Sequence, residues 1–145
     1  FSCNNTRFEC RNDTSCTIRC GRNACRYSYF RCPYNSSVEC RLECTGESAC
    51  RDSNIDGSGV DTLTIITQNG YDSDGDSSTR NSIILCPDGG SLCNITAIGN
   101  DALYSSDINA RNTGKLIVLA FTGDETLQWS NIYVINIHNL LFEVF

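Results

Sequence analysis

Apolar and polar residues alternate with a period of two over several short segments of this chain. The stretch CRLECTGESACRDSNI, from Cys40 to Ile55, has apolar side chains at every second position before a Gly-containing turn and alternates again after it. This alternation is typical of strands that bury one face, because successive strand side chains point to opposite sides. The pattern therefore predicts two short strands joined by a turn.

The same pattern recurs along the chain. Copies of the unit begin at Cys16, Cys40, Leu63, Cys93 and Ile117. The copy at Leu63 is degenerate, because the insert YDSDGDSSTRN interrupts it. In the last copy, the alignment places Ile117, Leu119 and Phe121 on the inward face. A repeat of about 24 residues indicates a stack of similar units.

A unit of this length cannot bury its own apolar face and is stabilised by stacking on its neighbours. With short strands and no amphipathic stretch of helix length, the repeat predicts an all-β, single-stranded parallel β-helix. We expect about six coils in a single domain over residues 1–145, with an insert loop at 70–82. An immunoglobulin-like sandwich is the alternative, but it does not predict side chains in register at a fixed period.

The cysteines test this interpretation. Eleven cysteines in 145 residues indicate disulfides and an oxidising compartment; zinc is the competing interpretation, but the chain has one histidine and no CxxC pair. In the aligned coils, cysteine occupies both positions that flank a corner or neither. Disulfides within a corner predict this co-occurrence, whereas disulfides between stacked coils, which are also within reach, do not. The expected pairs are Cys10–Cys16, Cys20–Cys25, Cys32–Cys40, Cys44–Cys50 and Cys86–Cys93.

Cys3 is left over from this pairing. Its context matches that of Cys25, so Cys3 occupies a post-turn position whose partner would precede Phe1. We expect Cys3 to be unpaired or to form a bridge between subunits.

The net charge and the glycosylation sequons restrict the expected partners and location of the protein. The net charge is −6 and the eleven Lys and Arg residues are scattered, which argues against a nucleic-acid partner. No apolar run approaches the roughly 20 residues of a membrane span, and any signal peptide is expected to have been removed before Phe1. Four N-x-[ST] sequons begin at Asn4, Asn12, Asn35 and Asn94. Together with the cysteines they favour a secreted, extracellular or cell-surface eukaryotic protein that carries N-linked glycans.

The first and last segments of the sequence are out of phase. The sequence starts just after a turn, with half a coil, and finishes with the first strand of a new coil. One interpretation is that the sequence belongs to a longer chain. The other is that the two edges are complementary and that subunits stack head to tail into a filament, through strand addition. The residues expected at these edges are Phe1, Phe8, Leu140, Phe142, Val144 and Phe145.

Candidate chemistry is sparse. Asp72, Asp74 and Asp76 offer oxygen ligands that calcium prefers, although Gly75 is not where an EF-hand needs it, and a solvated acidic insert is the alternative. His138 lies in an expected strand without a nucleophile and base around it, so we expect no enzymatic activity.

Other side chains have structural or binding interpretations. Trp129 and Tyr133 are candidates for stacking on sugars, but isolated exposed aromatic residues are common on surfaces. The threonines of DTLTIIT suggest an ice-binding ladder, but the other coils do not repeat them. A column of hydroxyl residues at one inward corner is expected to bond to one another and to turn backbone groups. Its members are Thr6, Ser28, Ser53, Ser106 and Ser130.

The units CTIRCGRNACRYSYFRCP and CRLECTGESACRDSNI resemble the cysteine-rich β-helix repeats of extracellular proteins from microbial eukaryotes. The resemblance implies a filamentous or cell-surface role and transfers no catalytic residues. We therefore expect a glycofibril-like structural subunit that binds copies of itself. A monomeric module that recognises carbohydrate or a cell-surface partner is the alternative, and a carbohydrate-active enzyme is a remote third.

Overall fold

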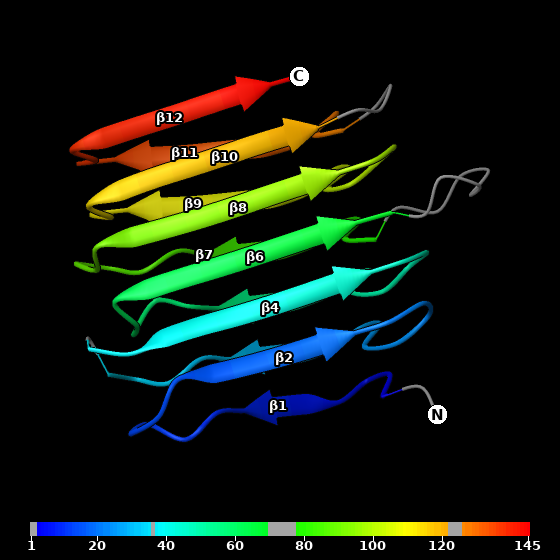
Figure 1. Ribbon diagram of the computed structural model, residues 1–145, viewed down its shortest axis with the longest axis horizontal. Helices are drawn as coiled ribbons and strands as arrows, with labels where there is room; N and C mark the ends of the chain where they lie inside the picture. Colours follow the sequence, from blue (N-terminus) through cyan, green and yellow to red (C-terminus); the bar gives the residue numbers. More distant parts are fainter. Residues whose placement is uncertain (1–2, 36, 70–77, 122–125) are drawn as a thin grey trace.

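The structure is a computed structural model that describes residues 3–35, 37–69, 78–121 and 126–145, and it shows a solenoid built from two parallel sheets (Figure 1). The short-strand sheet contains β1 (Arg7–Glu9), β3 (Tyr29–Arg31), β5 (Asn54–Asp56), β7 (Ile83–Leu85), β9 (Asp107–Arg111) and β11 (Asn131–Ile135). The long-strand sheet contains β2 (Cys16–Cys20), β4 (Glu39–Thr45), β6 (Thr62–Gln68), β8 (Leu92–Ile98), β10 (Lys115–Phe121) and β12 (Asn139–Val144).

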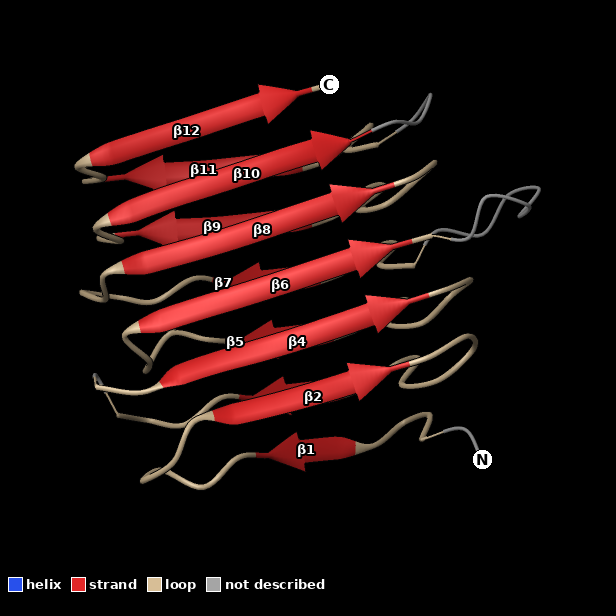
Figure 2. Cartoon of the chain, in the orientation of Figure 1, coloured by secondary structure: helices blue, strands red, loops and turns tan. Residues whose placement is uncertain are grey.

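The chain alternates between the two sheets, so each coil contributes one strand to each of them. Successive strands of a sheet pair in parallel, and the path makes about five turns (Figure 1). The described residues contain strands, turns and loops and no helix (Figure 2). The predicted all-β parallel solenoid is therefore confirmed, and parallel pairing throughout is incompatible with an immunoglobulin-like sandwich.

The period of two in the sequence corresponds to the two faces of each strand. In β4, the inward Cys40, Leu42 and Cys44 are buried, whereas the outward Arg41 and Glu43 are partly exposed. The parallel register stacks equivalent residues into rows along the axis, and one inward row of the long-strand sheet spans all six of its strands. Its members are Cys16, Cys40, Leu63, Cys93, Leu116 and Leu140.

The predicted register of the last copy is wrong by one residue. Leu116, and not Ile117, pairs with Cys93, and this places Leu116, Val118 and Ala120 in the core. The expected inward residues Ile117, Leu119 and Phe121 are outward and half-buried instead. A shift of one residue exchanges the two faces of a strand. The segment KLIVLAF is apolar at both parities, so the strand pattern could not distinguish them.

Five disulfides staple the corners, and they join the pairs expected from the sequence. They are Cys10–Cys16, Cys20–Cys25, Cys32–Cys40, Cys44–Cys50 and Cys86–Cys93. In a bridge-free upper coil the same slots hold the fully buried apolar residues Ala97 and Leu103, whereas the buried Thr67 takes the slot directly above Cys44. At another corner Gly57 faces Leu63, where an added Cβ would lie 2.6 Å from the leucine Cδ2. That corner therefore needs glycine to admit the leucine.

The other corner of each coil turns through a left-handed residue just before the hydroxyl column. The φ angles there lie between 53° and 59°. These residues are Asn5, Tyr27, Asp52, Asn81, Ser105 and Trp129. A non-glycine residue at positive φ is uncommon, so its recurrence in every coil shows that the same turn is repeated along the axis.

Candidate assembly interface

The upper edge of the solenoid is an apolar surface formed by β11 and β12. Leu140, Phe142 and Val144 point in the same direction as the core residues of β10, but they are 55%, 47% and 65% exposed. On the short-strand sheet, Val134 pairs with the buried Ala110 and is itself exposed. The described residues thus leave the apolar top of the core uncovered.

The lower edge is formed by β1 and β2. The ring of Phe8 stacks on that of Phe30 with centroids 5.0 Å apart, and Phe8 and Ile18 are only partly buried. Phe1, which was also expected at this edge, lies outside the described residues. Phe145 belongs elsewhere, because its ring stacks on the outward ring of Phe121 with centroids 4.9 Å apart.

A ladder of hydroxyl groups runs along one inward corner between these two edges. The Ser53 hydroxyl donates to the Cys25 carbonyl oxygen at 2.9 Å and accepts the N–H of Ser28 at 3.3 Å. The same two contacts recur in the coils of Ser28, Ser82, Ser106 and Ser130. The predicted bonds to turn backbone groups are therefore confirmed, but in the described part of the chain these hydroxyls bond to backbone groups and not, as was also expected, to one another.

Ser82 is a member of this serine ladder that the sequence pattern missed. It follows the insert, which shifts its spacing from Ser53, but the register Ile55–Ile84 restores the alignment. Ser82 precedes the inward Ile84 by the same spacing as Ser53 precedes Ile55, and this spacing, rather than the distance from Leu63, identifies it.

A second ladder joins amide side chains on the surface of the opposite corner. Asn136 donates from Nδ2 to the Oδ1 of Asn112, which donates in turn to the Oδ1 of Asp88, each at 3.0 Å. Counted from the first residue of each strand, these residues follow β11, β9 and β7 at the same offset, so only the register of the strands reveals them. Asn12 has the same offset from the first residue of β1 at the lower edge.

The outward face of the long-strand sheet is charged near the lower edge. Glu43 accepts from the Nε atoms of Arg41 and Arg19, both at 2.7 Å, and these hydrogen bonds lower the pKa of its carboxyl group. Arg19 and Glu43 lie opposite one another on β2 and β4. Further along the axis this face becomes apolar, with Ile117 and Leu119 on β10.

The short-strand sheet contains another coupled pair. The Tyr29 hydroxyl donates to Asp56 Oδ2 at 3.0 Å, and Ser58 donates to Asp56 Oδ1 from its hydroxyl at 2.6 Å. Burial opposes ionisation of Asp56, but these hydrogen bonds outweigh it and hold the pKa of the carboxyl group below its usual value. Burial, together with the bond to Asp56, raises the pKa of Tyr29.

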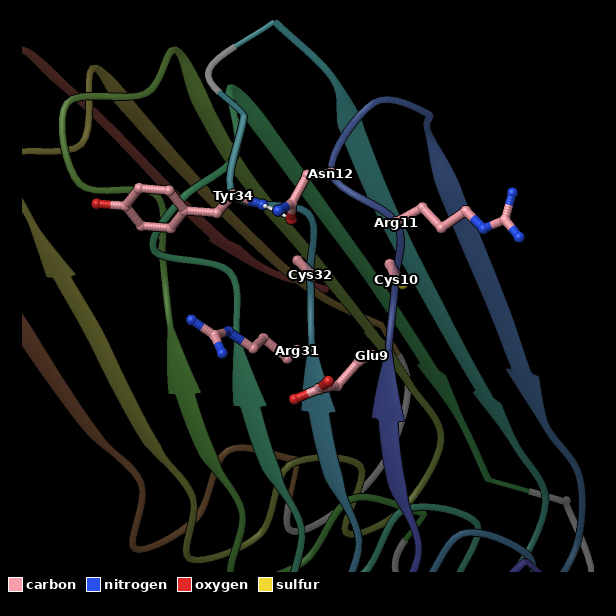
Figure 3. A pocket seen from close by; sticks show the side chains of 7 residues that line it. All are labelled: Glu9, Cys10, Arg11, Asn12, Arg31, Cys32 and Tyr34. Atoms are coloured by element: carbon pink, nitrogen blue, oxygen red, sulfur yellow. Dashed lines mark hydrogen bonds between the residues drawn. The ribbon is translucent and has the colours of Figure 1, made fainter.

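A polar groove of about 230 Å³ lies beside Asn12 on the amide-ladder corner (Figure 3). The Oδ1 of Asn12 accepts the N–H of Tyr34 at 3.0 Å, and the Tyr34 ring is 72% exposed. Glu9 and Arg31 line the same groove. The Asn12 side chain is exposed, so its Nδ2 is accessible for a glycan.

The other sequons differ in their surroundings. Asn4 is exposed and accepts the N–H of Arg26, while Asn35 lies one coil above Asn12 and accepts the N–H and hydroxyl of Ser37. Asn94 is in the middle of β8, where its Oδ1 is buried between neighbouring strands. A glycan at Asn94 would therefore stand on the face of the long-strand sheet, away from the corners.

The last candidates from the sequence are the acidic residues of the insert and the unpaired cysteine. Asp72, Asp74 and Asp76 lie outside the described residues, and among the residues that are described no group of three His, Cys, Asp or Glu side chains could hold a metal ion. Cys3 is an exposed free cysteine. No helix in the described part of the chain could span a membrane.

Comparison with protein-family models, with curated proteins and with solved structures gives no match to this chain. The five disulfides fit a secreted or extracellular protein.

Proposed function

We propose that this protein is a structural subunit of an extracellular, glycosylated filament or surface appendage, and that copies associate by stacking their solenoid edges. One observation carries the proposal. The exposed Leu140, Phe142 and Val144 continue three buried rows of the core, and β12 is the edge strand of its sheet. An unpaired strand edge beside an apolar surface is a template for strand addition.

The lower edge is suited to cover the upper one. Phe8 and Ile18 are the first members of inward rows, so a second copy placed above would supply the next member of each row. A heterologous contact that does not close produces an open filament. Six strands in each sheet, at about 4.8 Å per strand, give a rise of about 29 Å per copy.

Glycans would favour this mode of growth over lateral association. Asn12 and Asn35 occupy the same corner in adjacent coils, and Asn12 contacts the coil of Asn35 through the Tyr34 N–H. Bulky glycans there would form a stripe parallel to the axis. They would hinder contacts between the sides of two rods.

The test is to image the purified 145-residue chain by negative-stain electron microscopy while following its size by sedimentation over a range of concentrations. We expect fibres with an axial repeat near ~3 nm. The double variant L140S/F142S removes apolar surface from the edge and should remain dispersed. L141S, on the outward face of the same strand, is the matched control and should form fibres. A wild-type chain that stays monomeric at high concentration would reject the proposal.

A recognition module is the second candidate, and the exposed aromatic residues favour it. Trp129 and Tyr34 are each 72% exposed, and Tyr34 borders a second groove of about 370 Å³. Such a module would bind carbohydrate as a monomer. Glycan-array binding that is lost in W129A or Y34A, from a chain that does not assemble, would support it over the filament.

A further inference from the structure

One outward row of the long-strand sheet carries opposite charges at its two extremes. The register places Arg19, Glu43, Ile66, Thr96, Leu119 and Glu143 in this row. Arg19 is the member on β2 at the lower edge, and Glu143 is the member on β12 at the upper edge. Neither charge is covered by a further strand in the described chain.

Where an arginine and a glutamate are already adjacent in this row, they form an ion pair. On β2 and β4, Arg19 and Glu43 are cross-strand neighbours, and the arginine Nε lies 2.7 Å from the carboxylate. The Arg19 side chain remains 75% exposed, so its guanidinium retains room for a second carboxylate. A parallel strand that carried a glutamate at this position below β2 would meet the same guanidinium.

We propose that Arg19 and Glu143 fix the register in which two copies of this chain stack, with β2 of one copy added in parallel to β12 of the copy below and β1 added to β11. This inference rests on the proposed end-to-end assembly and specifies its geometry. In this register Arg19 lies opposite Glu143, and Ile18 lies opposite Phe142. The inward rows then continue from one copy to the next without interruption.

The serine ladder agrees with the same register. Thr6 is the first member of the serine ladder and Ser130 is the last. In the stacked register Thr6 of the upper copy follows Ser130, and its hydroxyl reaches the position from which each ladder serine donates to the coil below. The serine ladder is thus continuous across the junction.

Other registers lose these contacts. A slip of one residue turns the inward side chains outward. A slip of two keeps the faces but places Arg19 opposite Leu141 or Phe145 instead of Glu143, and the serine ladder is then broken. Burial of apolar surface alone would not distinguish a slip of two from the proposed register, whereas the charge pair disfavours that slip.

The overall distribution of charge also favours contact between unlike edges. Residues 1–31 contain six arginines and two acidic residues, whereas residues 112–145 contain one lysine and three acidic residues. Contact between two lower edges would bring like charges together. Attraction between the basic lower edge and the acidic upper edge orients the approach before the strands pair.

Zero-length cross-linking tests the register directly. In the Arg19→Lys variant, a carbodiimide can join the introduced amine to an adjacent carboxylate. A link from this amine to Glu43 within one copy serves as an internal standard in monomer and polymer alike. Because one amine forms a single amide, we expect an alternative product, in which the introduced amine is joined to Glu143 instead of Glu43, only in the polymer. Mixing ¹⁴N- and ¹⁵N-labelled chains should show by mass spectrometry that the link to Glu143 joins different copies.

A charge reversal supplies the functional readout. E143R places two arginines opposite one another at the junction, and we expect the critical concentration for assembly to rise by about tenfold. K115E, on the outward face of β10, is the control: it changes the charge without touching the junction and adds negative charge to the acidic edge, so it should not raise the critical concentration. Polymers of the Arg19→Lys variant that show the link to Glu43 but no link to Glu143 would overturn the register and leave the proposed assembly standing. A chain that never polymerises would overturn both.

Discussion

The hydroxyl of Ser106 donates to the carbonyl oxygen of Thr79, one coil below, at 2.7 Å. The oxygen of this hydroxyl also accepts the N–H of Ser82 at 3.2 Å. One small buried side chain therefore satisfies two backbone groups on either side of the turn in the lower coil. The left-handed turn at this corner directs these backbone groups inward, where water does not reach them.

Removing one hydroxyl from this ladder should destabilise the fold. S106A leaves the Thr79 carbonyl and the Ser82 N–H without this partner, and we expect a loss of about 1–3 kcal/mol in the free energy of unfolding. Denaturant titration measures this loss. S105A, at the partly exposed neighbour, should change the free energy by less than about 0.5 kcal/mol. Equal effects of the two substitutions would contradict a special role for the ladder.

The cysteine-free coils suggest how a disulfide can be replaced. Ala97 and Leu103 occupy the slots that Cys44 and Cys50 occupy two coils below, so the double variant C44A/C50L should retain a filled core. We expect it to lose about 2 kcal/mol, which is the chain-entropy contribution of a bridge that closes such a short loop. C44A/C50A also leaves a cavity and should lose more in the same denaturant titration. A smaller loss in C44A/C50A would show that the packing argument is wrong.

The corrected register of β10 makes a comparison of neighbouring positions informative. Val118 is fully buried, whereas the adjacent Leu119 is outward and half-buried. V118S should lower the free energy of unfolding by at least about 2 kcal/mol, because it places a hydroxyl in the core. L119S should cost clearly less in the same thermal or denaturant experiment. The opposite order would restore the register that the sequence alignment predicted.

The sequence predicted most of this fold because its repeat is chemically distinct on the two faces. In the lower coils, cysteine and leucine alternate with arginine and glutamate. The sequence therefore shows both which side chains face inward and which cysteines form pairs. The upper coils lack this contrast, and KLIVLAF reads equally well in either register. The amide ladder and the Arg19–Glu43 pair were missed for another reason: their members become neighbours only when the coils are stacked in register.

The Tyr29–Asp56 pair should make stability depend on pH at the acidic end. The folded pKa of Asp56 is below its ordinary value of 3.8, so its contribution is complete above about pH 4 and is lost as pH falls through the folded pKa. D56N should therefore show a smaller decrease in unfolding free energy between about pH 5 and pH 2 than the wild type. Parallel curves for the two proteins would exclude Asp56 as a source of the acid dependence.

Cys3 offers a reporter of assembly that needs no added label site. Cys3 and Cys25 accept equivalent hydrogen bonds from Ser28 and Ser53, but Cys25 is buried whereas Cys3 is exposed. In a stack, the copy below would cover Cys3. We expect its thiol to react readily with a maleimide in the monomer and at least about tenfold more slowly in the polymer, since a covered thiol is less accessible. The same rate in both states would contradict burial of this corner.

The disulfides have a mechanical consequence, because each of them closes within a coil and none of the five joins one coil to the next. Tension applied along the axis is therefore opposed between coils by non-covalent contacts, chiefly the hydrogen bonds and packing between parallel strands. Once a coil detaches, each bridge keeps a loop of 5 to 8 residues closed and shortens the thread that is released. Under force the lower coils should unspool in shorter steps than the upper ones, and a reducing agent should remove the difference.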